Sequence, residues 1–263
     1  MQKKQNNKKK TNRQGNKTMT RKVSRKLEDS LFADVTAADR NRAVEEIIES
    51  SSPRKSFFVM IAVSAALATM GIIEDNVAVI IGGMLVAPML SPILAIALGI
   101  ETADNRLIWR SFKVVLWWTA YAIGASLIFA LLLNQGRVDV ENLNHEMSLR
   151  VSVNLSTILI ALVAGFGASI SLVRSELTKF MSGVAIAVAL IPPLSVSAIG
   201  ISILNFNIFY NAFASFVINL VGIVLAALVV FSLVRLSEAK RKIDMELEEE
   251  EDLLENKIIK LSI

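Results

Sequence analysis

The chain of 263 residues contains no cysteine and a single histidine, His145. Without cysteine it can form neither a disulfide nor a thiolate site, and one histidine excludes a paired-histidine metal centre. A His-Glu-x-x-His sequence, a phosphate-binding glycine loop and a serine beside a plausible base are also absent. We therefore expect no enzyme activity, no cofactor and no metal site.

Charged residues are sparse in two long stretches, 57–134 and 151–235, although both ends of the chain are highly charged. Apolar residues make up 53% of the chain, and uninterrupted apolar runs of about 18 or more residues are typical of membrane-spanning helices. We predict an all-α integral membrane protein with six transmembrane helices. They are expected at 57–73, 77–100, 111–133, 152–173, 181–204 and 208–235.

The remaining segments complete the predicted domain organisation. Residues 1–30 are expected to be a basic, disordered cytoplasmic tail, because the first 27 hold eleven Lys or Arg and no acid. Residues 31–52 are typical of an amphipathic pre-membrane helix, which Thr36 can cap. The six-span domain covers 53–236, and a charged cytoplasmic helical tail follows at 237–263.

The charges between the spans predict the orientation of the chain. Basic and non-basic connections alternate, which places both termini in the cytoplasm and the protein in the plasma membrane as a multi-pass protein. The expected partners are the lipid bilayer and further copies of the chain in a homo-oligomer. The basic N-terminal tail can also contact anionic lipid, and we expect no nucleic-acid partner.

Prolines interrupt the second and the fifth apolar segment at matching places. The sequence Pro-x-Leu-Ser begins at Pro88 in one and at Pro192 in the other, 104 positions apart. Proline has no N–H and cannot bond to the carbonyl four residues earlier, so neither segment should be one continuous helix. Three spans followed by three spans have opposite orientations. We therefore predict two inverted three-helix repeats, 57–134 and 152–236, with the second and fifth helices broken by proline.

Broken helices at matching places in two halves indicate a site near the bilayer midplane. Ser91 and Pro92 suit the cap and first turn of a new helix, whose positive end can hold an anion or polar ligand. The freed carbonyls can instead hold a cation, or a serine hydroxyl or water can satisfy them in a purely structural kink. The candidate pathway residues are Gly82, Gly83, Met84, Pro88, Ser91, Pro92, Gly183, Val188, Pro192, Pro193, Ser195 and Asn219.

Small residues recur every four positions in the second segment, from Gly83 to Gly99, and in the fourth at Ala161, Gly165 and Ser169. Such stripes permit close contact between helices, and lining a narrow pore is the alternative. We expect packing to be their main role. Asn219, near the centre of the last span, either joins two helices or contacts a solute.

Two blocks of this sequence resemble a known family. Residues 78–94, AVIIGGMLVAPMLSPIL, and residues 183–194, GVAIAVALIPPL, resemble the two signatures of the hydrophobic membrane proteins called domain of unknown function 389. Asn219-Leu220-Val221-Gly222-Ile223 is similar to a third stretch of that family. The resemblance covers about residues 50–235. It implies a prokaryotic integral membrane protein and brings no activity with it.

Three hypotheses for the function follow. The first is a transporter or channel for a small solute or ion, with its site at the two broken helices. The second is a membrane-anchored scaffold or regulatory protein that acts through its two charged tails. The third, an intramembrane enzyme acting on lipid, is weak because no acid–base pair is present in the spans.

Overall fold

The computed structural model describes most of the chain between residues 35 and 245 as α-helix. The described residues are 35–50, 55–86, 89–133, 145–152, 154–174, 176–177, 190–241, 243 and 245. In chain order the helices are α2 (Ala37–Ser50), α3 (Lys55–Ile73), α4 (Val77–Val86), α5 (Leu90–Glu101), α6 (Asn105–Leu133), α7 (His145–Val151), α8 (Leu155–Val173), α10 (Ile191–Ser202) and α11 (Phe206–Val234). No strand occurs among these residues, which confirms the all-α class for them. The predicted tail 1–30 and most of 237–263 lie outside them.

Four of the described helices are long and apolar enough to cross a membrane, namely α3, α6, α8 and α11. α4 and α5 together make a fifth candidate, bent by 55° at the break between them. The described helices therefore have the length and composition expected of a membrane protein. The predicted segment 181–204 is described only from Leu190 onward, where α10 forms, so six spans stay a prediction.

The outer faces of α6 and α8 expose large apolar side chains. Trp117 on α6 is 70% exposed, and Leu155 and Val163 on α8 are 71% and 72% exposed. In water, a continuous apolar surface of this kind would favour aggregation. In a bilayer the same side chains contact lipid, so these faces fit a membrane environment.

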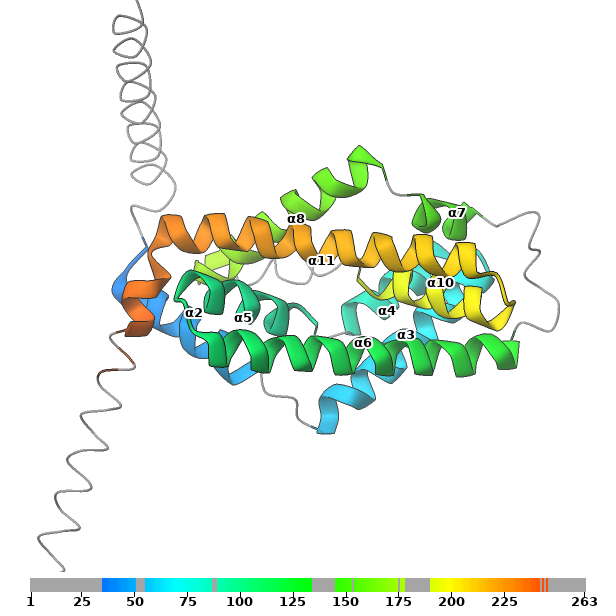
Figure 1. Ribbon diagram of the computed structural model, residues 1–263, viewed down its shortest axis with the longest axis horizontal. Coiled ribbons are helices and arrows are strands. Elements are labelled where there is room, and N and C mark those ends of the chain that lie inside the picture. Colours follow the sequence, from blue (N-terminus) through cyan, green and yellow to red (C-terminus); the bar gives the residue numbers. More distant parts are fainter. Residues whose placement is uncertain are drawn as a thin grey trace, which may run out of the picture.

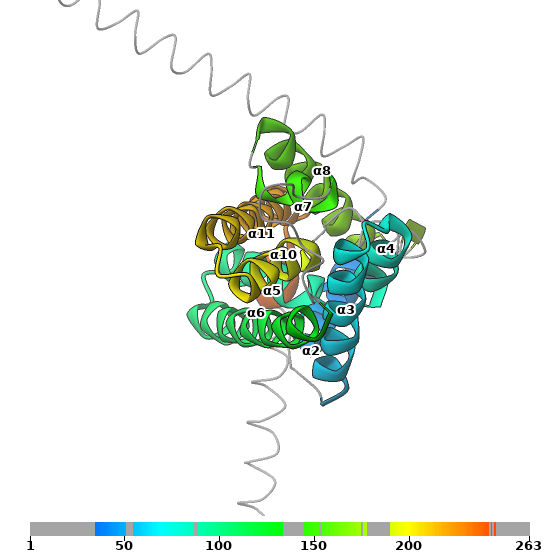
Figure 2. The same ribbon diagram turned by 90° about the vertical axis from the view of Figure 1, so that its right-hand side faces the viewer.

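The two longest helices, α6 and α11, form the frame of the bundle. Each has 29 residues, they run antiparallel, and α5 and α10 lie in the layer between them (Figures 1 and 2). α5 packs against the start of α6 and the second half of α11. α10 packs against the start of α11 and the second half of α6. α3 and α4 cover the frame beside α6 and α10, and α8 lies on α11.

A tight corner turns the chain from α5 into α6. The Asp104 amide donates to the Gly99 carbonyl at 2.8 Å, and Ala103 between them has the left-handed conformation, with φ 55°. This arrangement satisfies the last carbonyls of α5. The Asp104 carboxylate then accepts from the amides of Arg106 and Leu107, at 2.9 and 3.0 Å, and caps α6. One helix therefore ends and the next begins within four residues.

Glycine is needed at the start of this corner because the two helix backbones approach closely. A Cβ on Gly99 would lie 3.0 Å from the amide nitrogen of Ile108. The same corner occurs between α3 and α4 and between α10 and α11. Between α3 and α4 the glycine is Gly71, the left-handed residue is Asp75 and the capping residue is Asn76. Between α10 and α11 the same three roles are taken by Gly200, Leu204 and Asn205.

The helices before and after the middle of the chain correspond in length. α3 and α8 each have 19 residues, α5 and α10 have 12, and α6 and α11 have 29. α10 and α11 begin 101 positions after α5 and α6. This spacing differs by three residues, nearly one helical turn, from the 104 positions that separate the two Pro-x-Leu-Ser sequences.

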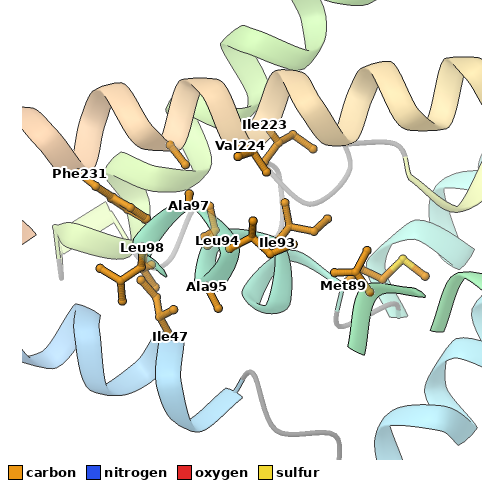
Figure 3. Packing of buried hydrophobic residues seen from close by; sticks show 14 of the residues in the cluster. Ile47, Met89, Ile93, Leu94, Ala95, Ala97, Leu98, Ile223, Val224 and Phe231 are labelled. Atoms are coloured by element: carbon orange, nitrogen blue, oxygen red, sulfur yellow. The ribbon is translucent and has the colours of Figure 1, made fainter. Parts of the chain in front are cut away.

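The apolar core of the bundle is built around α5, whose residues from Pro92 to Gly99 are all buried. Figure 3 shows Leu98 next to Ile47 of α2, while Ile93 points toward Ile223 of α11. Because lipid is as apolar as these side chains, such contacts stabilise the bundle through close packing and dispersion. α5 is therefore held by α2, α6 and α11 together.

Small residues bring α8 into close contact with α11. A Cβ on Gly165 would lie 2.6 Å from the Cα of Ile223, and one on Gly222 would lie 2.7 Å from the Cβ of Ala161. Neither neighbour can move without shifting a helix backbone. This crossing supports the packing role predicted for the small residues of the fourth segment.

We predict that Gly165→Ala destabilises the protein, because the added methyl group meets the backbone of α11. Overpacking of this kind costs about 1–3 kcal/mol, and the better helix propensity of alanine returns up to about 1 kcal/mol. In detergent the melting temperature should fall by about 2–4 °C for each kcal/mol of net loss. Gly124→Ala is the matched control, since no described atom lies within 4 Å of its added Cβ, and it should be neutral or stabilising. Equal melting temperatures for the two variants would contradict the close crossing.

Candidate functional site

α5 and α10 begin in the middle of the bundle and run to its opposite ends. α5 ends at the corner into α6, beside α2, and α10 ends at the corner into α11, beside α7 (Figure 1). A helix N-terminus carries a partial positive charge and amide hydrogens that have no intrahelical partner. The middle of the layer between α6 and α11 therefore combines two such ends.

Neither of these N-termini has a side-chain cap. Met89 and Leu190 occupy the two N-cap positions, and neither forms a capping hydrogen bond. Ser91 is the second residue of α5, so the prediction that Ser91 caps this helix is wrong. An apolar residue in the cap position offers the first-turn amides no side-chain acceptor.

The described prolines of the second and fifth predicted segments lie in the first turns of α5 and α10. Pro92 is the third residue of α5, and Pro192 and Pro193 are the second and third residues of α10. Residues of the first turn have no intrahelical acceptor for an N–H, so proline loses no hydrogen bond there. These prolines are therefore compatible with the first turns of α5 and α10. The remaining candidates of the two breaks, Pro88, Gly183 and Val188, lie outside the described residues.

The two serines of the Pro-x-Leu-Ser match have different surroundings. Ser195 is fully buried, and its hydroxyl lies 3.0 Å from that of Ser126 on α6. This hydrogen bond joins α10 to the second half of α6. Ser91 is only half-buried. α10 begins 101 positions after α5, so the position in α5 that matches Ser195 by helix start is Leu94 and not Ser91.

Three of the candidates lie on α4. Gly83 is packed against α3, where Ser64 Oγ donates to its carbonyl at 2.6 Å. A Cβ on Gly83 would lie 2.9 Å from the Ser64 carbonyl oxygen, so packing requires this glycine. Met84 is buried in an apolar cluster with Ile80. Gly82 is half-buried, and a Cβ there would meet no described atom within 4 Å. Of these three, Gly82 has room beside it.

Two buried polar side chains lie halfway along the frame helices. Asn219 is the 14th residue of α11 and Trp118 is the 14th residue of α6. Asn219 is 8% exposed and Trp118 is 0% exposed. The indole of Trp118 contacts Phe216 of α11 edge to face, with 5.8 Å between the ring centroids. Trp118 therefore reaches across the layer in which α5 and α10 begin.

The indole N–H of Trp118 is buried and has no hydrogen-bond partner in the described part of the chain. A buried donor left unpaired costs about 1–3 kcal/mol, and such groups are rare in folded proteins. On the inner face of α6, Leu107 and Val115 lie on the side of α5, whereas Ser126 contacts α10. Along α6, Trp118 lies between Val115 and Ser126, halfway along the helix.

Reasoning from sequence missed Trp118. An aromatic residue within an apolar helical face is usually ordinary core, and nothing in its immediate neighbours distinguishes it. Asn219 lies 101 positions later, and both residues are the 14th of a 29-residue helix. That correspondence becomes visible only with the spacing of the corners, because the proline match gives 104.

Ionised side chains are absent from the buried middle of the frame, as far as the structure describes it. The buried charged residues are Glu146 on α7 and Lys240 after α11, and both lie at the ends of the bundle. The field in the middle therefore comes from backbone dipoles, chiefly from the two helix N-termini.

Comparison with known proteins supports the resemblance of the two sequence blocks. A family model described as domain of unknown function (DUF389) matches residues 84–225. The chain belongs to the DUF389 family. It is 34% identical over 181 residues to an uncharacterised protein of Methanocaldococcus jannaschii, a match that covers 68% of this chain and 54% of the relative. The chain thus spans about half the length of that relative. No solved structure matches the chain.

The DUF389 region contains the first turns of both half-helices together with Trp118 and Asn219. α2 and the segment after α11 lie outside it, yet both are packed against it. At that end, Lys240 Nζ pairs with Asp104 Oδ2 at 2.9 Å, and Ser237 Oγ donates to Glu101 Oε1 at 3.1 Å. An ion pair and a hydrogen bond therefore hold the segment after α11 on the corner between α5 and α6.

α2 lies within the range 31–52 for which a pre-membrane helix is predicted, and it docks on the same end of the bundle. Thr36 and Asp39 form a reciprocal cap, in which the Asp39 amide donates to Thr36 Oγ1 at 3.2 Å and the Thr36 amide donates to Asp39 Oδ2 at 3.1 Å. Ile47 is buried against α5, and Arg42 donates to the Leu172 carbonyl at 3.1 Å. α2 therefore ties the C-terminus of α8 to α5.

The Asp104 carboxyl at this end has a pKa below its ordinary value of 3.8. Burial alone would raise its pKa, but the amide of Leu107, the ammonium group of Lys240 and the amide of Arg106 together outweigh burial. The folded state thus favours the ionised carboxylate. Ionisation of Asp104 stabilises the fold above its ordinary pKa, and this contribution is lost as the pH falls through the lowered pKa.

We predict that the DUF389 protein loses stability as the pH falls below about 4, in part through Asp104. Asp104→Asn keeps a good helix cap but removes the charge, so the acid-induced loss should be smaller in this variant and stability near neutral pH should be lower. Melting temperatures in detergent between pH 3 and 6 measure both effects. Identical pH profiles for the two proteins would contradict a role for the ion pair with Lys240.

Proposed function

We propose that the protein is a membrane transporter or channel for a small solute or ion, which binds between the N-termini of α5 and α10. The observation that carries the proposal is that two half-helices start in the middle of the bundle, from opposite ends, with no side-chain cap. Discontinuous helices of this kind hold substrates and ions in many secondary transporters. A purely structural kink would gain from capping, whereas a solute site needs its backbone groups left available.

The proposal includes two inverted three-helix repeats in a six-span protein. The equal lengths of α3 and α8, of α5 and α10, and of α6 and α11 support it. So do the antiparallel direction of α6 and α11 and the repeated glycine corner. In this arrangement the segment 181–202 is the fifth span, with α10 as its second half.

The proposal also places the α2 end of the bundle on the cytoplasmic side of the plasma membrane. Arg106 and Arg110 near the start of α6, and Arg235 and Arg241 after α11, stand at that end, and positive residues favour the cytoplasm. Both termini are then cytoplasmic. The exposed apolar faces of α6 and α8 contact lipid or further copies of the chain in a homo-oligomer.

A second candidate function is a membrane-anchored scaffold or regulator that acts through its charged tails. The docking of α2 and of the segment after α11 on one end of the bundle favours it, because both tails then emerge together. Removal of residues 1–28 and 246–263 separates the two functions. Solute flux should survive this truncation in a transporter, whereas loss of a cellular phenotype without any flux would favour the scaffold.

We predict that Asn219→Leu reduces solute flux into liposomes about tenfold at low solute concentration, since one hydrogen bond to a solute contributes about 1–1.5 kcal/mol. Leucine has a similar size and keeps the packing of α11. Asn211→Leu is the control, because Asn211 is exposed on the same helix and should tolerate the change. If Asn219 only joins helices, its variant will lose melting temperature and keep the flux of the protein that remains folded.

We predict opposite accessibility for the first helical residues after the three corners. The chain has no native cysteine, so single cysteines can replace Val77, Asn105 and Phe206, all of which are exposed. In whole cells a membrane-impermeant thiol reagent should label positions 77 and 206 from outside and position 105 only after permeabilisation. Labelling of all three from the same side would exclude the inverted repeats.

A further inference from the structure

We propose that the ligand bound between α5 and α10 is a small, weakly hydrated monovalent anion. This inference rests on the proposed function, because it names the solute for the same site. Two independent kinds of observation carry it. One is the pair of uncapped helix N-termini, and the other is the fully buried indole N–H of Trp118, which lacks a partner among the described residues.

The partial positive charge of the two helix N-termini matches a ligand with a single negative charge. Each helix N-terminus is equivalent to about half an elementary positive charge, so the N-termini of α5 and α10 together provide about one. No ionised side chain is buried near them in the described residues. A divalent anion would keep about one uncompensated charge in an apolar interior, and a cation would be repelled.

The buried polar groups halfway along the frame helices and the first turns of α5 and α10 include several donors. An indole N–H can only donate, and the amide of Asn219 offers two further hydrogens. The first-turn amides are those of Leu90 and Ser91 in α5 and Ile191 in α10, since the prolines that follow have none. A small anion accepts hydrogen bonds from every direction and can satisfy the indole N–H together with these amides.

The surroundings of the site disfavour strongly hydrated ions. The apolar cluster that contains Trp118 also contains Met89, Leu190 and Phe216. Each of these three residues is at most 4% exposed. An ion that enters such a site exchanges most of its water for a few fixed donors, which is costly for ions that hold water tightly. Nitrate and iodide should therefore bind better than chloride, and sulfate should not bind.

The binding test uses the purified full-length protein in detergent and compares potassium nitrate with potassium gluconate at equal concentrations. Nitrate should raise the melting temperature of the wild-type protein relative to gluconate, since a ligand of the folded state stabilises it. Trp118→Phe keeps an aromatic ring but loses the N–H, and should need about ten times more nitrate for the same shift. Trp117→Phe is the matched control on the neighbouring residue, whose side chain is 70% exposed and points away from the core.

The flux test uses the same three proteins in liposomes, with nitrate, iodide, chloride, sulfate and potassium as separate probes. We expect nitrate and iodide to enter fastest, chloride more slowly, and sulfate and potassium not at all. Trp118→Phe should reduce nitrate flux about tenfold at low nitrate, and Trp117→Phe should leave it unchanged.

The two tests distinguish failure of the anion site from failure of transport. Nitrate stabilisation that depends on Trp118, without flux of any probe, supports the anion site and overturns the transporter. Potassium flux without nitrate stabilisation supports the transport function and overturns the anion site. An equal nitrate effect in all three proteins is a general salt effect and also overturns the site. If Trp118→Phe does not fold, Asn219→Asp serves instead, because its negative charge should abolish nitrate stabilisation, and persistence of that effect would overturn the inference.

Discussion

The close backbone contact at the glycine corners is the constraint on which the rest of the bundle depends. At Gly99 and Gly200 the next helix returns so closely that a Cβ would collide with its amide backbone. Each corner therefore lays a 12-residue half-helix along a 29-residue frame helix, one from each end. At about 1.5 Å per residue, α5 and α10 are each about 18 Å long and the frame helices are about 43 Å long. Laid along the frame from its two ends, α5 and α10 leave on the order of 7 Å between their first residues. The separation of the two N-termini thus follows from helix lengths and corner geometry together.

The sequence predicted the features that come from local covalent chemistry and from composition. Apolar runs predicted the long apolar helices α3, α6, α8 and α11, which have the length and composition of membrane helices. The breaks predicted from proline stay a prediction. Asn219 was recognisable because an amide in an apolar span has few ordinary roles. The N-cap of α5 was misplaced from Met89 to Ser91, since the point at which a helix begins inside a bundle is decided by tertiary contacts rather than by the best capping residue.

The features that sequence reasoning missed depend on relations between distant residues. The corners share a glycine followed five residues later by Asn or Asp, at Gly71, Gly99 and Gly200, but this short pattern gains meaning only when the backbone contact behind it is known. The corners at Gly99 and Gly200 are 101 positions apart, which is also the separation of Trp118 and Asn219. The proline match, at 104, pairs Ser91 with Ser195, which instead bonds to Ser126.

Backbone dipoles have a physical advantage over a charged side chain at such a site. An arginine or lysine at the centre of a membrane helix costs about 2.5–3.5 kcal/mol on insertion scales, and it would remain a full charge when the site is empty. Two helix N-termini provide a similar total charge in fractions that the surrounding backbone already holds in place. Because these dipoles cannot gain or lose protons, the field in the middle of the bundle is independent of pH. Asp104, whose pKa is lowered, lies instead at the α2 end, where its ion pair with Lys240 holds the segment after α11 on the corner between α5 and α6.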